Sequence, residues 1–348
     1  MLAGRAHVEG ASQEMIRSFL FVPGDSERKQ AKALSSAADA VIIDLEDSVA
    51  EAKLPEARQM AFAALRARAE RIHSAMRAGE QGTAAASHSP TLWIRVNALS
   101  SGKLVEDLVA VMGGAPHGIV LPKVVTPFDV TEISHYLSAL EQREGLPVGG
   151  TRLLVIATET PAALLSLNKY VDVFSRSQRA GQTPKAFVGG AQNASSTLVA
   201  YRRLTGLTWG MEDLGAALGT SSKVDEAGHL NFTFQMARST CLLTASALNI
   251  QAIDGVHADF RDSEGLKREA AAARRDGFTG KLAIHPDQVE SINAAFSPSP
   301  AEVEHARRIV AAFEAAPDAG VLSLDGAMID RPHLVQAQRI LAAASRTR

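Results

Sequence analysis

The sequence predicts an α/β fold, a (β/α)8 TIM barrel followed by a C-terminal helical lid segment. Eight short apolar runs lie between residues 18 and 286, and helical patterns separate most of them. This span of about 270 residues is close to the usual size of such a barrel. We therefore divide the chain into an N-terminal extension (1–16), a catalytic barrel (17–296) and a lid segment (297–348).

The predicted strands have continuous apolar cores, as expected of parallel strands that are covered on both faces. Most of them end at glycine, proline or a charged residue. In chain order they span 18–24, 40–48, 92–97, 118–123, 152–161, 207–211, 252–260 and 281–286. Helices are predicted at about 53–78 and 236–248, and residues 79–90 form a polar connector.

Composition limits the partners of the chain. With 46% apolar and 21% charged residues, it has the profile of a soluble globular protein. A formal charge of −2 without a basic cluster argues against nucleic acid as a main partner. No stretch approaches about 18 apolar residues and the N-terminus lacks a signal-peptide pattern, so we expect a cytoplasmic protein without a membrane partner. The single cysteine, Cys241, excludes an internal disulfide and fits a core position.

Acidic residues gather at the predicted carboxyl ends of strands, where ligands bind in α/β folds. Asp44, Glu46 and Asp47 end the second strand, and their mutual repulsion is costly unless cations or hydrogen-bond donors lie among them. Glu159 follows the apolar part of the fifth strand, and Asp213 follows the sixth strand beside another acid. Adjacent carboxylates on a turn suit a hard divalent cation with oxygen ligands.

Two of the acids have a second interpretation. Asp213 would instead cap a helix that begins near Leu214, although the second strand-end carboxylate, Glu159, favours the cation. Asp330 lies near the start of the final predicted helix, and its local sequence alone favours a helix cap.

Basic residues near the strand ends are candidate binding residues, and Arg95 and the first-helix group each have two interpretations. Arg95 is flanked by apolar residues of the third strand, so its guanidinium meets either a substrate carboxylate or a structural acid. Arg28, Lys29 and Lys32 open the first helix and form either a solvated face or a patch for phosphates. Lys123 stands at the end of the fourth strand.

The two strand-end histidines are weaker candidates. His257 and His285 have the residue type of zinc ligands, but the sequence offers no third nitrogen or sulfur ligand at a matching spacing. We therefore expect hydrogen-bonded structural histidines.

Two segments depart from a regular barrel. Glu159 and Asp213 are 54 positions apart, more than the roughly 30 residues of a βα unit, so 175–205 contains an insertion with loop character at 182–185 and 189–190. A short extra strand from Phe187 is the alternative. The tail has a helix at about 301–316, a loop with Gly320, Asp325 and Gly326, and a final helix from about 332. It looks too short for a core of its own, so we expect it to pack on a barrel.

Short motifs along the chain carry a family resemblance. The first set is Phe21-Val-Pro-Gly24, Asp44-Leu-Glu-Asp47, Ile94-Arg-Val-Asn97, Leu121-Pro-Lys123, Glu159-Thr, Gly210 to Leu214, Phe278-Thr-Gly-Lys281, Ile284-His-Pro286 and Met328-Ile-Asp330. On these residues the chain resembles the citrate lyase β-subunit and malyl-CoA lyase family of the HpcH/HpaI aldolase superfamily. From Gly219 onward it is most similar to citramalyl-CoA lyases, through Thr220-Ser-Ser-Lys223, Gln251-Ala-Ile-Asp254, Asp259-Phe-Arg-Asp262, Phe296-Ser-Pro-Ser-Pro300 and Met328-Ile-Asp-Arg-Pro332.

The resemblance implies roles for the strand-end residues. In this family the fold is a (β/α)8 barrel with a C-terminal lid, usually a trimer, that cleaves or forms a carbon–carbon bond in acyl-CoA thioesters. Glu159 and Asp213 match its magnesium ligands, and Arg95 matches the arginine that holds the keto acid. Glu46 and Asp47 match acids that support the water molecules of the metal.

The resemblance also assigns Asp330, which matches a lid aspartate that reaches a neighbouring subunit as acid or base. This implication replaces the helix cap as our expectation. The chain departs from the family pattern at Trp209, at Met211 and in 175–205, and we expect these residues to set substrate choice.

The sequence therefore predicts a Mg²⁺-dependent acyl-CoA lyase that works as a homotrimer or a dimer of trimers. It would split a 3-hydroxyacyl thioester, such as citramalyl-, malyl- or citryl-CoA, into a keto acid and an acyl-CoA, or join them. Arg28 and Lys32 are candidates for the phosphates of coenzyme A. The alternatives are a thioesterase for the same hydroxyacyl-CoA class and a citryl-carrier lyase subunit of a larger complex.

Overall fold

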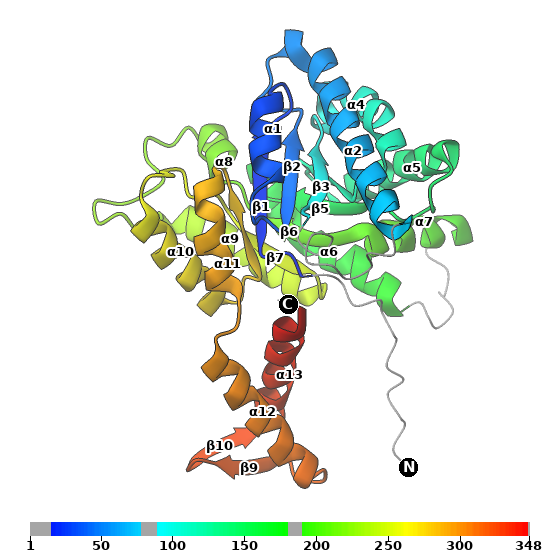
Figure 1. Ribbon diagram of the computed structural model, residues 1–348. Helices are drawn as coiled ribbons and strands as arrows, with labels where there is room; N and C mark the ends of the chain where they lie inside the picture. Colours follow the sequence, from blue (N-terminus) through cyan, green and yellow to red (C-terminus); the bar gives the residue numbers. More distant parts are fainter. Residues whose placement is uncertain (1–14, 78–88, 180–189, 347–348) are drawn as a thin grey trace. The chain divides into compact units, whose positions relative to one another are not determined.

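The computed structural model describes residues 15–77, 89–179 and 190–346. These residues form two compact units, Ile16–Ile292 and a C-terminal unit that begins at Asn293 (Figure 1).

The first unit is a closed barrel, and the predicted (β/α)8 fold is confirmed. In the described part of the chain, eight parallel strands pair in sequence order, and β8 closes onto β1. The strands are β1 Ser18–Pro23, β2 Ala40–Asp44, β3 Thr91–Arg95, β4 Gly118–Leu121, β5 Arg152–Ile156, β6 Leu204–Thr208, β7 Gln251–Asp254 and β8 Gly280–Ala283. Strand β6 begins three residues before the predicted 207–211, because Thr205 and Gly206 interrupt the apolar pattern from which the prediction was made.

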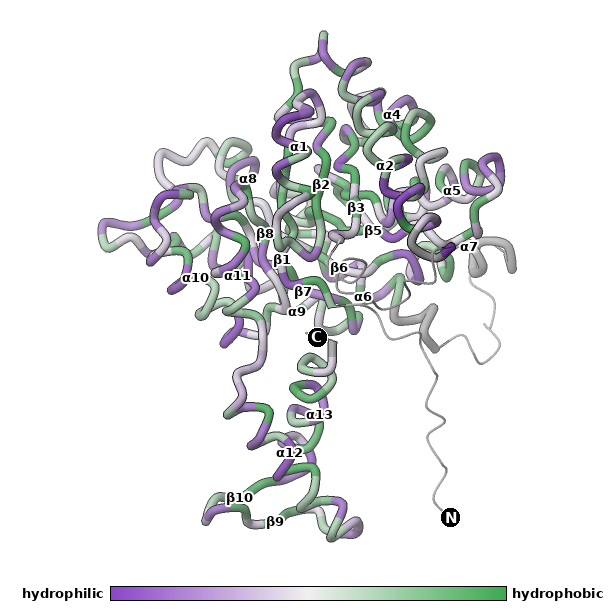
Figure 2. Tube along the Cα trace, viewed as in Figure 1, coloured by the Kyte–Doolittle hydropathy of each residue, from purple (hydrophilic) through white to green (hydrophobic). Residues whose placement is uncertain are grey.

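Helices surround the strands (Figure 1). In the first unit they are α1 Glu27–Leu34, α2 Leu54–Arg77, α4 Leu104–Val111, α5 Pro127–Glu144, α6 Pro161–Arg179, α7 Gly190–Arg203, α8 Met211–Leu218, α9 Phe232–Ala247 and α10 Ser263–Asp276. Helix α11 Val289–Phe296 begins in the first unit and ends in the second. Figure 2 shows that the barrel strands are mostly hydrophobic, whereas the outer helices mix both kinds of residue. Cys241 on α9 is fully buried, as predicted, and burial raises the pKa of its thiol. No helix among the described residues is long and apolar enough to span a bilayer.

The segment 175–205 differs from its prediction. Its described residues before β6 belong to the end of α6 and to α7, and Gly190, predicted as loop, is the first residue of α7. A second helix before β6 therefore accounts for much of the extra length. The predicted loop at 182–185, the glycine at 189 and the possible strand from Phe187 lie outside the described residues.

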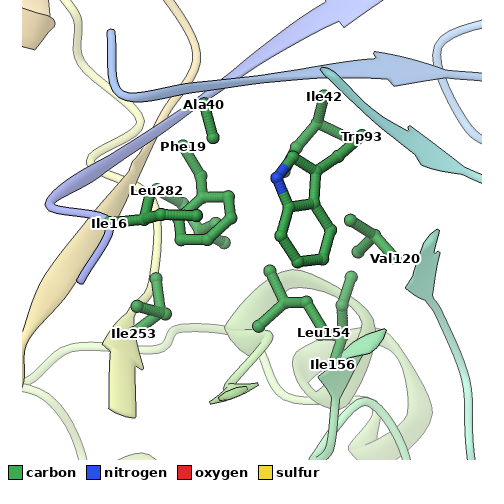
Figure 3. Packing of buried hydrophobic residues seen from close by; sticks show 10 residues of the cluster. All are labelled: Ile16, Phe19, Ala40, Ile42, Trp93, Val120, Leu154, Ile156, Ile253 and Leu282. Carbon is green, nitrogen blue, oxygen red and sulfur yellow. The ribbon is translucent and has the colours of Figure 1, made fainter. Parts of the chain in front are cut away.

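The barrel interior is filled by side chains at alternating strand positions (Figure 3). Trp93 is the largest, and its indole meets Phe19 edge-on with ring centroids 5.5 Å apart. Gly118 on the neighbouring strand faces the indole, and a Cβ there would overlap the ring. The other interior members are Ile16, Ala40, Ile42, Val120, Leu154, Ile156, Ile253 and Leu282. By the same alternation, the next inward positions on β2 and β3 are Asp44 and Arg95, which the strand register places opposite each other.

The C-terminal unit is an antiparallel hairpin with two helices. It contains α12 Pro300–Ala315, β9 Val321–Leu324, β10 Ala327–Asp330 and α13 Arg331–Arg346. Residues 325 and 326, predicted as loop, form the two-residue turn of this hairpin, both with positive φ. The expectation that the tail is too short for its own core is wrong. Buried side chains of both helices and β10 pack together, namely Ala306, Ile309, Phe313, Ile329 and Ala337.

Candidate active site

An arginine–aspartate pair forms the floor of the site at the carboxyl end of the barrel. Arg95 donates from Nε to Asp44 Oδ1 over 2.6 Å and from Nη2 to Asp44 Oδ2 over 2.7 Å. Its guanidinium also lies over the Phe21 ring, 5.0 Å from the centroid. Burial alone would raise the pKa of Asp44, but the hydrogen bonds and charge of Arg95 lower it. Of the two predicted partners of Arg95, the structure shows the structural acid.

Two further acids follow β2 and face two cations. Arg95 Nη1 lies 3.0 Å from Glu46 Oε2 and 3.5 Å from Asp47 Oδ2. Lys123 Nζ lies 2.7 Å from Glu46 Oε1 and 3.1 Å from Asp47 Oδ1. Arg95 and Lys123 are thus cations that lie among these acids and offset their repulsion. Burial raises the pKa of Glu46, although Arg95 and Lys123 partly offset this effect.

Lys123 connects this cluster to the residues after β5 and β6. Its main-chain N–H donates to Glu159 Oε2, and its Nζ lies 3.5 Å from Asp213 Oδ1. Its backbone has a φ of +54°, which is uncommon for a residue with a Cβ. The sequence placed Lys123 at a strand end but assigned it no contact, and only its proximity to several predicted acids could have drawn attention to it.

Glu159 is the buried acid of the site, with 2% of its surface exposed. Burial raises its pKa to about 8; the N–H of Lys123 lowers it, and the charges of Asp213 and Glu46 raise it. Gly210 leaves room for it, since a Cβ at position 210 would lie 2.9 Å from Glu159 Cγ.

Asp213 lies in the first turn of α8 and does not cap it. The helix begins at Met211 with Gly210 as its N-cap residue, so the capping interpretation is wrong. The carboxylate of Asp213 is about one-third exposed and faces Lys123. The neighbouring Glu212 pairs instead with Lys223.

The donor set fits a magnesium ion held by few protein ligands. No group of three or more His, Cys, Asp or Glu side chains is arranged to hold a metal within the described ranges. Glu159 and Asp213 are nevertheless close enough for the charge of Asp213 to raise the Glu159 pKa. Mg²⁺ takes about six oxygen ligands and is commonly held by one or two carboxylates, with water and substrate as the rest. Two carboxylates in an acidic setting match that pattern.

The two predicted histidine candidates have structural partners. His257 Nδ1 lies 3.0 Å from Glu269 Oε1. His285 Nδ1 accepts from the N–H of Asp287 over 3.3 Å, and its ring stacks on Phe260. These contacts agree with the hydrogen-bonded interpretation.

Trp209 directly follows β6. Its side chain is buried, and its indole N–H donates to Asp254 over 2.8 Å. Asp254 also accepts from Lys281 and Arg238, so Trp209 belongs to a buried polar network behind the strands. These contacts give Trp209 a structural role, and its expected effect on substrate choice stays a prediction.

The remaining candidates lie on α1 and in the C-terminal unit. Arg28 and Lys32 are exposed on α1, in its first and last turns. Asp330 ends β10 directly before α13, with one-third of its side chain exposed. Its Oδ1 lies 2.5 Å from Nδ1 of His333, and this contact lowers the Asp330 pKa.

Family models match almost all of the described chain. The model for HpcH/HpaI aldolase/citrate lyase matches residues 17–286, and that for a C-C bond lyase of the TIM-barrel fold matches 231–346. The chain belongs to the HpcH/HpaI aldolase/citrate lyase family. The resemblance seen in the sequence is thereby confirmed.

Relatives within this family have several activities in their names. The chain is 32% identical over 330 residues to a (3S)-malyl-CoA thioesterase of Cereibacter sphaeroides, covering 94% of both chains. It is 34% identical to the citrate lyase subunit beta of Escherichia coli, covering 94% of this chain and 93% of the relative. A solved structure of the protein CitE from Mycobacterium tuberculosis, in complex with magnesium, acetoacetate and coenzyme A, is 30% identical with a TM-score of 0.65. It covers 95% of this chain and 98% of that one.

Proposed function

We propose that the protein is a Mg²⁺-dependent lyase for 3-hydroxyacyl-CoA esters, releasing a keto acid and an acyl-CoA or running in reverse. The observation that carries this proposal is the gathering of Glu46, Asp47, Glu159 and Asp213 around Lys123 and Arg95. The similarity to relatives named for citrate lyase and malyl-CoA chemistry supports the substrate class, CoA esters.

Glu159 and Asp213 are the residues that would hold Mg²⁺, as they match the family's ligands. The ion would supply Lewis acidity toward the oxygens of the keto-acid part of the substrate. Glu46 and Asp47 would accept hydrogen bonds from water beside the ion. Because these four acids repel one another, an added divalent cation stabilises their charged forms.

Arg95 would bind the carboxylate of the keto acid. Its Nε and Nη2 are occupied by Asp44, so Nη1 is the part of the guanidinium that faces the acidic site. The pair with Asp44 fixes the plane of the guanidinium, and a fixed donor costs less entropy when the substrate binds. Arg95 would then offset the negative charge of the keto acid.

Asp330 would be the acid or base of the reaction. Cleavage of the carbon–carbon bond leaves a thioester enolate, which a carboxylic acid at Asp330 would protonate at carbon; the reverse reaction uses the carboxylate as base. As in the family, the lid would act on a neighbouring subunit, so the working form would be a homotrimer or a dimer of trimers. Arg28 and Lys32 would contact the phosphates of coenzyme A.

A thioesterase is the second candidate, favoured by the relatives named (3S)-malyl-CoA thioesterase. The same site would bind the same substrates, but water would attack the thioester carbonyl. A subunit of a citryl-carrier complex, suggested by the citrate lyase subunit beta, would be active only with its companions.

One assay separates these functions. The purified protein is incubated with citramalyl-, malyl- and citryl-CoA, with Mg²⁺ or with excess chelator, and all products are measured. A keto acid with an acyl-CoA identifies the lyase, and free CoA with an intact hydroxy acid identifies the thioesterase. If no ester is consumed by the protein under any condition, both proposals fail. Asp213→Ala is the matched control for the metal-dependent rate.

A further inference from the structure

Lys123 lies among four carboxylates that come from three different strand ends. Its Nζ is 2.7 Å from Glu46, 3.1 Å from Asp47 and 3.5 Å from Asp213. Its main-chain N–H donates to Glu159. Lys123, which follows β4, therefore contacts the acids that follow β2, β5 and β6.

The backbone of Lys123 has a conformation that favours glycine. At φ +54° the residue is in the left-handed region, where a Cβ costs about 1 kcal/mol and glycine is the easiest choice. Glycine would present the same N–H to Glu159. Lysine at this position costs backbone free energy, which is expected if the contacts of its ammonium group stabilise the acidic site.

The charges around Lys123 show what the ammonium does. Arg95 uses two of its donor nitrogens on Asp44, so Lys123 supplies the closest cationic contacts to Glu46 and Asp47 and also reaches Asp213. Without it, these three acids would face one another with less compensation and would repel. Burial opposes the charged form of Lys123, but its hydrogen bonds to Glu46 and Asp47 raise its pKa above the ordinary value.

We propose that Lys123 is a positioning residue that organises the acidic site in two ways. Its main chain fixes Glu159, and its ammonium is an internal counter-ion of Glu46, Asp47 and Asp213. In the absence of metal, Lys123 offsets the repulsion between these acids. A divalent cation must compete with the ammonium group for the same carboxylates, so Lys123 lowers the affinity of the site for the cation. The competition rests on the proposed function, which places Mg²⁺ at Glu159 and Asp213; the counter-ion role does not.

Calorimetric titration of the full chain with magnesium chloride tests the competition. Lys123→Met removes the ammonium and keeps the main-chain N–H, so we expect Mg²⁺ to bind about ten- to a hundredfold more tightly, the effect of deleting one close cation. Lys123→Arg keeps the charge and should bind close to the parent. Lys103→Met is the matched control: Lys103 also pairs with one acid, Glu51, at 2.9 Å, and its loss should leave Mg²⁺ binding unchanged.

Thermal unfolding without metal tests the counter-ion role independently. At low ionic strength, Lys123→Met should melt below the parent because the acids repel, and added sodium chloride should reduce the difference. A melting difference that does not respond to salt would reflect lost packing and would overturn the counter-ion role. Should Lys123→Met fail to fold, Lys123→Gln replaces it in both experiments.

The outcomes keep the two proposals apart. If the parent binds Mg²⁺ and the folded Lys123→Met variant binds it equally or more weakly, the inference is overturned and the metal site stands. If the parent does not bind Mg²⁺, the proposed metal site and the competition both fail. The salt-dependent melting difference then decides the counter-ion role alone.

Discussion

Glu141 and Glu159 are both buried, at opposite ends of the barrel, but the pKa of Glu141 is lowered and the pKa of Glu159 is raised. Glu141, at the amino ends of β5 and β6, forms a bidentate pair with Arg203 at 2.6 Å, and both side chains are fully buried. It also accepts from the main-chain N–H groups of Gly149 and Thr151. Burial would raise the Glu141 pKa, but these partners lower it.

Glu159 has no such set of partners. It receives the N–H of Lys123, but burial raises its pKa to about 8, and the charges of Asp213 and Glu46 act in the same direction. The charge of Glu141 at the amino end is fully paired by groups of the same chain, so this ion pair stabilises the fold. The carboxyl-end cluster has an excess of negative charge that a ligand can offset. Incomplete compensation of buried charge is thus the physical difference between the candidate site and a structural ion pair.

The largest effect should follow from breaking the complete pair. Arg203→Met leaves Glu141 buried without its cation, and we expect a loss of about 3–5 kcal/mol in the free energy of unfolding. Urea unfolding of the variant and the parent measures it. Arg152→Met, which removes a single hydrogen bond to a carbonyl, is the control and should change stability by less than about 0.5 kcal/mol. Equal stability of the Arg203 variant and the parent would contradict the comparison.

The incomplete cluster should respond in the opposite way. Asp213→Ala removes one of several repelling acids, so stability should be kept or should rise while Mg²⁺ binding weakens by at least about a hundredfold, or about 2.7 kcal/mol. Calorimetry and thermal unfolding give the two quantities. Unchanged Mg²⁺ affinity would show that Asp213 is no ligand.

Asp330 extends the comparison to the C-terminal unit. Asp330→Asn should lower turnover by roughly 10²-fold, the scale of a lost general acid or base, with little change in Mg²⁺ affinity. Mixing it with Asp213→Ala should restore part of the activity if the lid of one subunit serves the site of another. Subunit exchange without recovery of activity would place the lid on its own subunit.

The smallest effect concerns pH at the amino end. Burial, with the charges of Arg68 and Arg152, lowers the pKa of His117 from 6.5 to about 4. Because the unfolded chain takes up the proton first, stability should be full above pH 6.5 and fall as the pH drops toward 4. The loss is about 1–2 kcal/mol at pH 5. His117→Gln should remove this part of the slope when unfolding is measured from pH 7 to 4. Identical slopes for variant and parent would refute it.

The fold was predictable because the features that specify it are local. Buried parallel strands appear as apolar runs. Strand β6 begins earlier than predicted, since Gly206 and Thr205 break its run, and the predicted fifth and seventh strands end too late, because β5 ends at Ile156 and β7 at Asp254. The hairpin and core of the tail were missed because they depend on contacts between α12, α13 and the strands.

The site was predictable only in part. Strand-end acids were visible as residue types, but the partners of Arg95 and Lys123 depend on strand register and on a positive φ. Arg203 and Glu141 are separated by 62 positions, and nothing in either local sequence indicates the other. Periodicity therefore predicts where charged residues lie along the chain, whereas their pairing depends on the closed barrel.

The contact between Gly118 and Trp93 has an evolutionary consequence. Because the indole occupies the space in which a side chain at 118 would lie, the two positions are free to change only as a pair. A descendant that acquires alanine at 118 needs a smaller residue at 93, and either step alone passes through a strained or hollow barrel. Related sequences should therefore show correlated substitution at these two positions, with a history set by packing and independent of the substrate.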